Sequence, residues 1–179
     1  MMIGVLGANG FVGSAICLAL KKKKIKFKKI TRRNYLKYQK YKFSFLINSS
    51  MPSKRFWAKK NPKADYEQTV NKTLFFCKNY IFKKFIHISS ISARCQKNTI
   101  YGKNKLLSEK IVKKLRNYSI YRLGPMYSPK LTKGVLVDLK NSKTVFVNKK
   151  SKYSFTDLSW IANYIIQNLK YNKNLIQEI

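Results

Sequence analysis

The sequence predicts an α/β protein, a doubly wound parallel sheet with helices on both faces, folded as a single domain over residues 1–179. Two observations concern the order of segments. Short apolar segments alternate with segments of helical composition, and a glycine-rich turn joins the first apolar segment to the first helical one. The third is the 45% hydrophobic content, which is enough to build one packed core.

Each element follows from the local pattern. We expect buried parallel strands at residues 2–6, 26–31, 43–47 and 84–88, and a first helix over residues 14–20. A second helix is expected from residue 101 to 115, because Leu107, Ile111 and Leu115 recur one turn apart on one face. Between residues 131 and 153 only a short helix and a strand at 144–147 are expected.

The charge balance is extreme, with 39 Lys and Arg against 6 Asp and Glu and a formal net charge of +33. Such a field attracts polyanions at low salt, so a nucleic-acid binder is one hypothesis. Only six of the 39 cations are Arg, however, and base and phosphate readout depends heavily on the Arg fork. We therefore expect no specific nucleic-acid binding, and interpret the Lys runs at residues 21–24 and 113–114 as solvated faces.

Cysteine usage and the N-terminal segment favour a cytoplasmic protein. Cys17, Cys77 and Cys95 form no CxxC pair, so neither a disulfide framework nor a metal site is predicted. Residues 1–20 carry no charge, but the cations follow this segment instead of preceding it, and glycines interrupt it. We therefore expect no transmembrane segment. The single histidine, His87, is interpreted as a packed strand residue.

The glycine turn predicts a dinucleotide site. Gly7 would allow the tight turn, Gly10 would let backbone amides approach a pyrophosphate, and Gly13 would let the helix pack on the strand. The helix N-terminus then offers N–H groups to phosphates, although a plain strand-to-helix turn could show the same spacing. The expected cofactor-binding residues of this turn are Gly7, Asn9, Gly10, Phe11, Val12 and Gly13.

The end of the second strand indicates which dinucleotide is bound. An acid there would accept a hydrogen bond from the 2′-hydroxyl of NAD, but this chain has Thr31 followed by Arg32 and Arg33. Guanidinium groups suit the 2′-phosphate of NADP, so NADP is predicted, with NAD as the alternative cofactor. An ordinary solvated pair of cations is the competing interpretation.

The fourth expected strand ends in Ser89 and Ser90, and Tyr101 and Lys105 follow at helical i, i+4 spacing. An ammonium beside a phenol lowers the pKa of the phenol, which would make Tyr101 a usable acid or base at neutral pH. Ser90 could hydrogen-bond the substrate oxygen. A YxxxK match alone arises easily by chance in so Tyr- and Lys-rich a chain; the order of glycine turn, strand and helix strengthens it.

In these motifs the sequence resembles the short-chain dehydrogenase/reductase superfamily, and within it the extended NAD-dependent epimerase/dehydratase branch that contains nucleotide-sugar enzymes. The resemblance rests on GANGFVG, FIHISS, YGKNKLLSEKIV, YRLGPMYSP and FTDLSWIA, which follow the family order. It implies a Rossmann-like domain and an NAD(P)(H)-dependent oxidoreductase acting on a carbonyl/alcohol pair, with a nucleotide sugar as the candidate small-molecule substrate.

The resemblance also assigns roles to individual residues. Ser90, Tyr101 and Lys105 would be catalytic, with Tyr101 and Lys105 also touching the cofactor. Asn71 would complete a proton relay, although a helix-surface asparagine is the alternative there. Asn48 and Ser49 stand where the family passes a small-residue turn along the cofactor.

Two departures from the family shorten this chain. Residues 34–42 leave no room for the usual third strand at the sheet edge, and residues 125–156 retain only part of the substrate lobe. Pro125, Ser128 and Trp160 replace the usual residue types. These losses motivate a second hypothesis, a catalytically reduced NADP(H)-binding module that acts as a structural or regulatory subunit, with an acidic protein partner. The family's homodimer is a further expectation.

Overall fold

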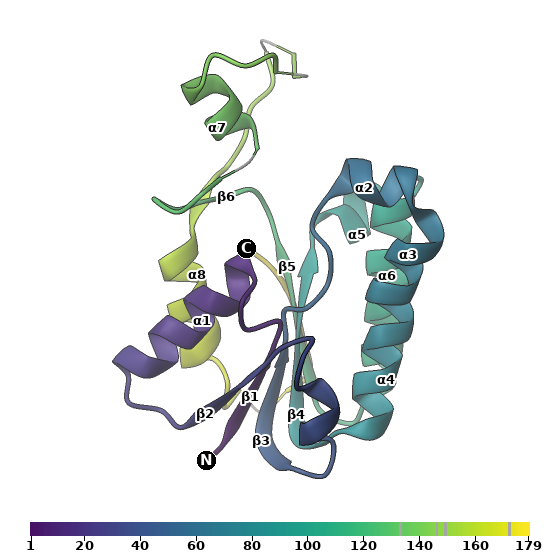
Figure 1. Cartoon of the computed structure of the whole chain (residues 1–179), viewed down its shortest axis with the longest axis vertical. Coiled ribbons are helices and arrows are strands. Elements are labelled where there is room, and N and C mark those ends of the chain that lie inside the picture. The colour runs from purple at the N-terminus through teal and green to yellow at the C-terminus, as the bar shows by residue number, and fades with distance from the viewer. Residues whose placement is uncertain (133, 146, 149, 172) are drawn as a thin grey trace.

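The computed structural model describes the whole chain except residues 133, 146, 149 and 172. Six parallel strands form one sheet in the order β2-β1-β3-β4-β5-β8 (Figure 1). This arrangement confirms the predicted parallel α/β fold. The strands are β1 (Ile3–Leu6), β2 (Phe27–Ile30), β3 (Lys42–Asn48), β4 (Ile81–Ser90), β5 (Tyr118–Leu123) and β8 (Leu175–Glu178).

The first strand organises the sheet because it lies between two parallel partners. Ile3 of β1 is in register with Phe27 of β2 on one side and with Phe45 of β3 on the other. Between β2 and β3 the chain forms only the short 3-10 helix η1 (Tyr35–Tyr38), so β2 is the edge strand. The predicted loss of the third strand is therefore confirmed.

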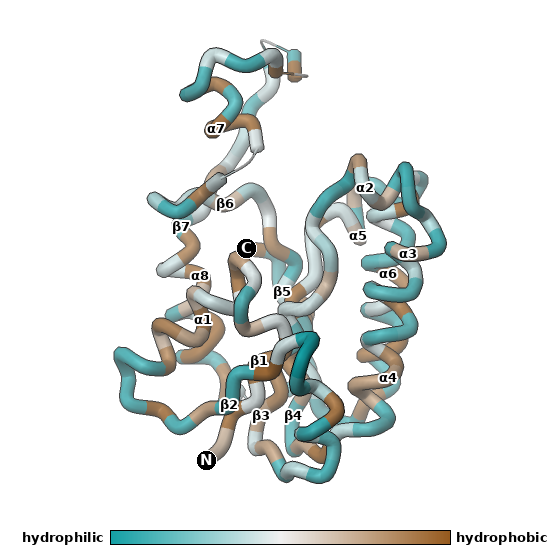
Figure 2. The backbone as a smooth tube through the Cα atoms, in the orientation of Figure 1, coloured by the Kyte–Doolittle hydropathy of each residue, from teal (hydrophilic) through white to brown (hydrophobic). Residues whose placement is uncertain are grey.

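Helices cover both faces of the sheet (Figure 1). α1 (Phe11–Lys22) and α8 (Leu158–Gln167) contact each other on one face. The other face carries the α6 layer, which consists of α2 (Arg55–Lys60), α3 (Pro62–Tyr66), the π-helix η2 (Glu67–Asn71), α4 (Lys72–Asn79), α5 (Ser92–Cys95) and α6 (Ile100–Val112). Figure 2 shows hydrophobic segments in the central strands and along α1 and α8, where one of the two cores lies.

The face that α6 buries differs from the predicted one. Leu107, Ile111 and Leu115 are only half-buried, whereas the polar side chains of Lys105 and Ser108 are among those packed inside. α6 contacts β4 and five neighbouring helical elements, α5, α4, η2, α2 and α3, at once. Polar groups on α3, β4, β5 and the loop before α2 supply partners for the polar side of α6, which apolar periodicity could not indicate.

The segment after Pro125 is the least packed described part of the protein. It contains β6 (Met126–Tyr127) and β7 (Thr156–Asp157), which pair with each other, and α7 (Val135–Lys140), which has no buried residue and stands away from the sheet in Figure 1. The strand predicted at residues 144–147 is not found in its described part; position 146 lies outside the described residues. The final strand, β8, was not predicted, although it pairs with β5.

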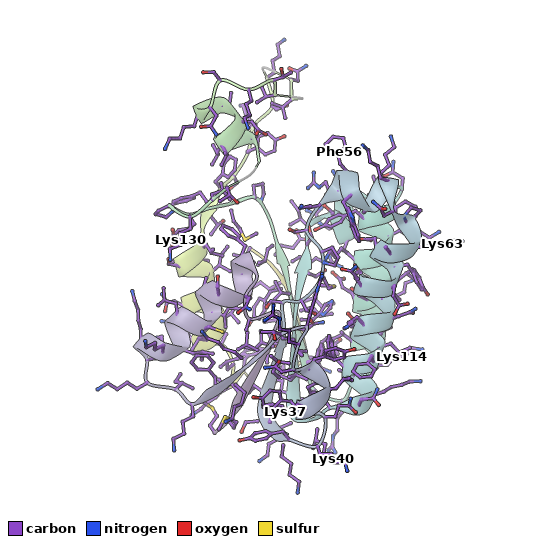
Figure 3. The ribbon with its side chains drawn as sticks, in the orientation of Figure 1. Lys37, Lys40, Phe56, Lys63, Lys114 and Lys130 are labelled. Atoms are coloured by element: carbon purple, nitrogen blue, oxygen red, sulfur yellow. The ribbon has the colours of Figure 1, made fainter. Side chains whose placement is uncertain are left out.

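Lysines point outward from many elements instead of forming one face. Figure 3 shows this for Lys37, Lys40, Lys63, Lys114 and Lys130. The runs at 21–24 and 113–114 are exposed, as predicted for solvated faces. No described helix is long and apolar enough to cross a membrane. The three cysteines are free thiols.

Candidate functional site

A cleft of about 1330 Å³ opens at the carboxyl ends of the strands. This is where open α/β sheets bind ligands, since the connections of β1 and β3 run to opposite faces of the sheet there. The cleft is lined from the β1–α1 turn, the end of β2, the loop after β3 with the start of α2, the end of β4, α6 and the segment after β5. One wall of the cleft comes from residues 131, 132, 134–136, 153 and 155.

The glycine turn has the geometry that its spacing predicts. Gly7 has a φ of +73°, and a Cβ atom there would lie 2.6 Å from the carbonyl oxygen of Ser49. A Cβ atom on Gly13 would lie 2.2 Å from the carbonyl oxygen of Gly7, so Gly13 is needed for close packing of α1 on the turn. Asn9, Gly10, Phe11 and Val12 line the cleft with Gly7, whereas Gly13 packs beneath it.

The N-terminus of α1 is open toward this cleft. Its N-cap residue, Gly10, supplies no side-chain cap, and the first turn of the helix holds no acid. The first amides of the 12-residue helix, together with its dipole, therefore favour an anion at this position. Arg32, Arg33 and Lys72 line the neighbouring part of the cleft. Among the described lining residues there is no carboxylate.

The turn after β3 is held from beneath by Asn48, which is fully buried and does not line the cleft. Its side-chain oxygen accepts a 2.6 Å hydrogen bond from the Ser50 hydroxyl, and its Nδ2 lies 3.4 Å from His87 Nδ1. Ser49 and Ser50 do line the cleft. Asn48 was predicted as a cofactor contact; the structure places it instead beneath the turn whose Ser49 and Ser50 line the cleft.

His87 is a packed strand residue, as predicted. Its ring is fully buried, and its Nε2 lies 3.1 Å from the Ser108 hydroxyl. Burial lowers the pKa of His87 to about 3, with the charge of Lys105 acting in the same direction. The ring is therefore neutral at physiological pH and is not a proton shuttle for the cleft.

Ser90, Tyr101 and Lys105 come together in the cleft from β4 and α6. Ser90 lies close enough to Tyr101 to lower the pKa of the Tyr101 phenol. Lys105 Nζ lies 5.2 Å from the centroid of the Tyr101 ring and donates a 2.9 Å hydrogen bond to the carbonyl oxygen of Pro52. Tyr101 and Lys105 are 7% and 3% exposed, so their polar ends act in a largely dry environment.

The protonation of this pair differs from the sequence-based expectation. Burial raises the pKa of Tyr101, against the lowering effects of the Ser90 side chain and of the charge of Arg55. Burial also lowers the pKa of Lys105 to about 7, although the negative charge of Asp65 opposes this change. The expected net lowering of the Tyr101 pKa is therefore not found, because desolvation outweighs the neighbouring charges. At neutral pH Tyr101 is a protonated phenol, ready to donate.

Asn71 is not brought to the cleft. Its side chain is exposed and donates a 2.5 Å hydrogen bond to Glu67 Oε2, one turn away on the same helix. The helix-surface alternative therefore describes its position.

A different polar pair packs behind the Tyr101–Lys105 pair. Asn104 Nδ2 donates a 2.8 Å hydrogen bond to Oδ2 of Asp65, which is fully buried, and Asp65 Oδ1 has no hydrogen-bond partner. Sequence reasoning missed Asp65 and also Arg55, which lines the cleft from α2. The sequence signal that could have found them is that acidic residues and arginines are both rare in this chain, with six of each.

A second buried charge fixes α6 against the sheet. Glu109 Oε2 accepts a 2.7 Å hydrogen bond from Arg122 Nη2, and Glu109 Oε1 accepts a 2.6 Å hydrogen bond from the Ser89 hydroxyl. Arg122 is also 3.4 Å from Glu178, which pairs with Arg94 at 2.7 Å. This network connects α6, β4, β5 and β8, and so helps to set where Tyr101 lies relative to Ser90.

Comparison with known proteins finds solved structures of the same fold. The chain superposes on Pal from Bacillus thuringiensis with a TM-score of 0.84 and 15% identity, covering 100% of this chain and 77% of that one. UDP-glucose 4-epimerase from Thermotoga maritima, solved with UDP-glucose, gives 0.81 and 14%, covering 100% and 76%. dTDP-4-dehydrorhamnose reductase from Bacillus anthracis, in complex with NADP, gives 0.76 and 16%, covering 99% and 74%.

No protein-family model and no curated protein sequence matches the chain. The likeness is therefore carried by the backbone over nearly the whole chain, at low sequence identity. It confirms the Rossmann-like fold that the motifs predicted: this chain has the fold of nucleotide-sugar epimerases and reductases.

Proposed function

We propose that the protein is an NADP(H)-dependent oxidoreductase of the epimerase/dehydratase type, acting on a carbonyl/alcohol pair. The observation that carries this proposal is the convergence of Ser90, Tyr101 and Lys105 on the cleft that also contains the glycine turn. These residues come from β4 and α6, and the turn comes from β1 and α1. A proton donor and an anion-binding helix terminus thus lie in one cleft.

The residues present fit a dinucleotide phosphate. Gly7 and Gly13 allow the turn and α1 to pack closely, because a Cβ atom at either position would collide with backbone atoms, and the uncapped start of α1 supplies amides for a pyrophosphate. Arg32 and Arg33, with no carboxylate among the described lining residues, suit a 2′-phosphate. The NADP complex of the Bacillus anthracis reductase supports NADP, and a Bordetella bronchiseptica enzyme of this fold solved with NAD supports NAD as the alternative.

Bound NADPH would supply hydride to the carbonyl carbon. As the carbonyl oxygen gains negative charge, the Tyr101 hydroxyl donates its proton, and Ser90 donates a hydrogen bond that holds the oxygen in place. Lys105, when protonated, stabilises the tyrosinate that is left. The raised pKa of Tyr101 keeps the proton available at neutral pH, which favours the reductive direction.

A nucleotide sugar is the candidate substrate, on the strength of the fold shared with the UDP-glucose epimerase. The wall that would cover it is formed by residues 131, 132, 134–136, 153 and 155. Because none of the residues of α7 is buried, this wall encloses a ligand less than a full lobe would. Simple carbonyl reduction, which releases its product after one step, demands less enclosure than epimerisation does.

The test is Tyr101→Phe, which removes the donated proton and keeps the ring. NADPH oxidation is followed with a panel of aldehydes, ketones and keto-sugars, and cofactor affinity is measured by fluorescence titration. We expect turnover to fall about 10²- to 10⁴-fold while the NADPH Kd changes less than about twofold. Turnover retained by the variant would rule out Tyr101 as the proton donor.

One observation supports a second candidate, an NADP(H)-binding module without catalysis. Lys105 Nζ donates to the carbonyl oxygen of Pro52, which competes with its action on Tyr101. In this case the wild-type protein would bind NADPH, oxidise none with any member of the panel, and tolerate Tyr101→Phe without any measurable change. An acidic protein partner would then be the expected binding target of its basic surface.

A further inference from the structure

We propose that the substrate carries an anionic group, a carboxylate or a phosphate, close to its reacting carbonyl, and that Arg55 binds this group. The inference rests on the proposed function and names the substrate class for the same site. It differs from the nucleotide-sugar candidate, because the anionic group that Arg55 would bind belongs here to a compact substrate.

Arg55 lies in the same cleft as Tyr101, the proposed proton donor. It is the first residue of α2, which packs on α6, and it lines the cleft that Tyr101 and Lys105 also line. The positive charge of Arg55 lowers the pKa of Tyr101, so the guanidinium and the phenol lie within electrostatic reach of each other. An anion bound by Arg55 would therefore sit near the oxygen that Tyr101 protonates.

Within the described part of the chain, the guanidinium of Arg55 also lacks a hydrogen-bond or ion-pair partner. Arg94 and Arg122 are ion-paired with carboxylates, and Arg32 Nη2 donates a 3.1 Å hydrogen bond to Gln68. For Arg55, no hydrogen bond or ion pair is found within the described part of the chain. An Arg presents N–H donors in a planar fork that matches a carboxylate or phosphate.

The cofactor does not account for this charge. Arg32 and Arg33 lie at the end of β2, which is the edge strand. Arg55 is the first residue of α2, which belongs to the α6 layer (Figure 1). The first pair serves the 2′-phosphate in the proposed function, and the start of α1 serves the pyrophosphate. Arg55 remains, together with Lys54, at the end of the cleft where Tyr101 acts.

The same end of the cleft also carries aromatic side chains. Phe56 and Trp57 follow Arg55 in the lining, and Figure 3 shows Phe56 at the tip of α2. A cleft of about 1330 Å³ exceeds the typical range of about 300–1,000 Å³ for one drug-sized ligand, which leaves room for a small second molecule beside a dinucleotide. A compact keto acid or keto phosphate fits this room.

The experiment compares matched probes that differ in the anion. Pyruvate is paired with methyl pyruvate, and dihydroxyacetone phosphate with dihydroxyacetone. Binding to the protein–NADPH complex is measured by calorimetry, and NADPH oxidation by absorbance, for the wild type, Arg55→Gln and Arg55→Lys. Arg116→Gln is the matched control, because it makes the same charge change at an exposed position outside the cleft lining.

We expect at least one anionic probe to bind at least about 10-fold more tightly than its neutral partner, and Arg55→Gln to remove that preference. Arg55→Lys should retain part of it, Arg116→Gln all of it, and NADPH affinity should stay within about twofold in each variant.

The outcomes separate this inference from the proposed function. Anion preference that depends on Arg55 without any turnover would support the binding site and contradict the reductase. Turnover without anion preference, or an Arg55→Gln variant that weakens NADPH and both probes alike, would overturn the inference. Turnover confined to nucleotide keto-sugars would contradict the proposal that the substrate is compact.

Discussion

Two charged side chains on the buried face of α6 differ in how fully they are paired. Glu109 is fully buried and makes hydrogen bonds of 2.6 Å to the Ser89 hydroxyl and 2.7 Å to Arg122. Lys105, one turn earlier, is 3% exposed and donates one hydrogen bond, to the Pro52 carbonyl oxygen. Its electrostatic partner of opposite sign, Asp65, forms no ion pair with it among the described residues.

The difference distinguishes a charge that pairing holds fixed from one whose protonation state can change near neutral pH. A buried carboxylate held by a guanidinium and a hydroxyl has its charge fixed and connects the elements around it. A buried ammonium without a carboxylate at contact distance has its pKa lowered to about 7, where it can gain or lose a proton. Burial alone therefore does not distinguish these two side chains, whereas ion pairing does.

The largest effect on stability is expected from breaking the paired region. Glu109→Gln leaves the buried Arg122 without its carboxylate and should lower the free energy of unfolding by about 3–5 kcal/mol. Urea denaturation followed by circular dichroism measures this change. Glu67→Gln is the control, because it makes the same substitution at an exposed position. A loss below about 1 kcal/mol would mean that the network is not structural.

A smaller effect, dependent on pH, is expected at the unpaired region. The pKa of Lys105 is lowered in the folded protein, so between pH 7 and about 10 the unfolded chain binds more protons at this site and stability rises with pH. Lys105→Met removes this dependence. Between pH 7 and 9 the wild type should gain about 2 kcal/mol relative to Lys105→Met. Parallel pH curves for the two proteins would contradict the buried, unpaired ammonium.

The smallest effect is expected from Asn71, which stands outside both regions. Its exposed side chain bonds only to Glu67 among the described residues, so Asn71→Ala should change stability by no more than about 0.5 kcal/mol and kcat by less than about twofold. The measurement is NADPH turnover beside a denaturation curve. A 100-fold loss of kcat with unchanged stability would restore Asn71 to the proton relay that the family resemblance implied.

Local patterns predicted most of the fold and the site. The strand at residues 2–6, the glycine turn after it and the Tyr101–Lys105 spacing depend on neighbouring residues alone, and the structure places them as expected. Predictions that depended on partners from elsewhere were less successful. The buried face of α6 and the burial of Asn48 both depend on contacts made by distant segments.

Periodicity and motif spacing are properties of the local chain, so they could predict the parallel α/β fold, the missing edge strand and the candidates Ser90, Tyr101 and Lys105. Only the folded structure showed the electrostatic environment of these side chains. Desolvation, the position of Asp65 and the approach of Arg55 set the pKa values of Tyr101 and Lys105. These effects depend on distances across the fold, which no local pattern records.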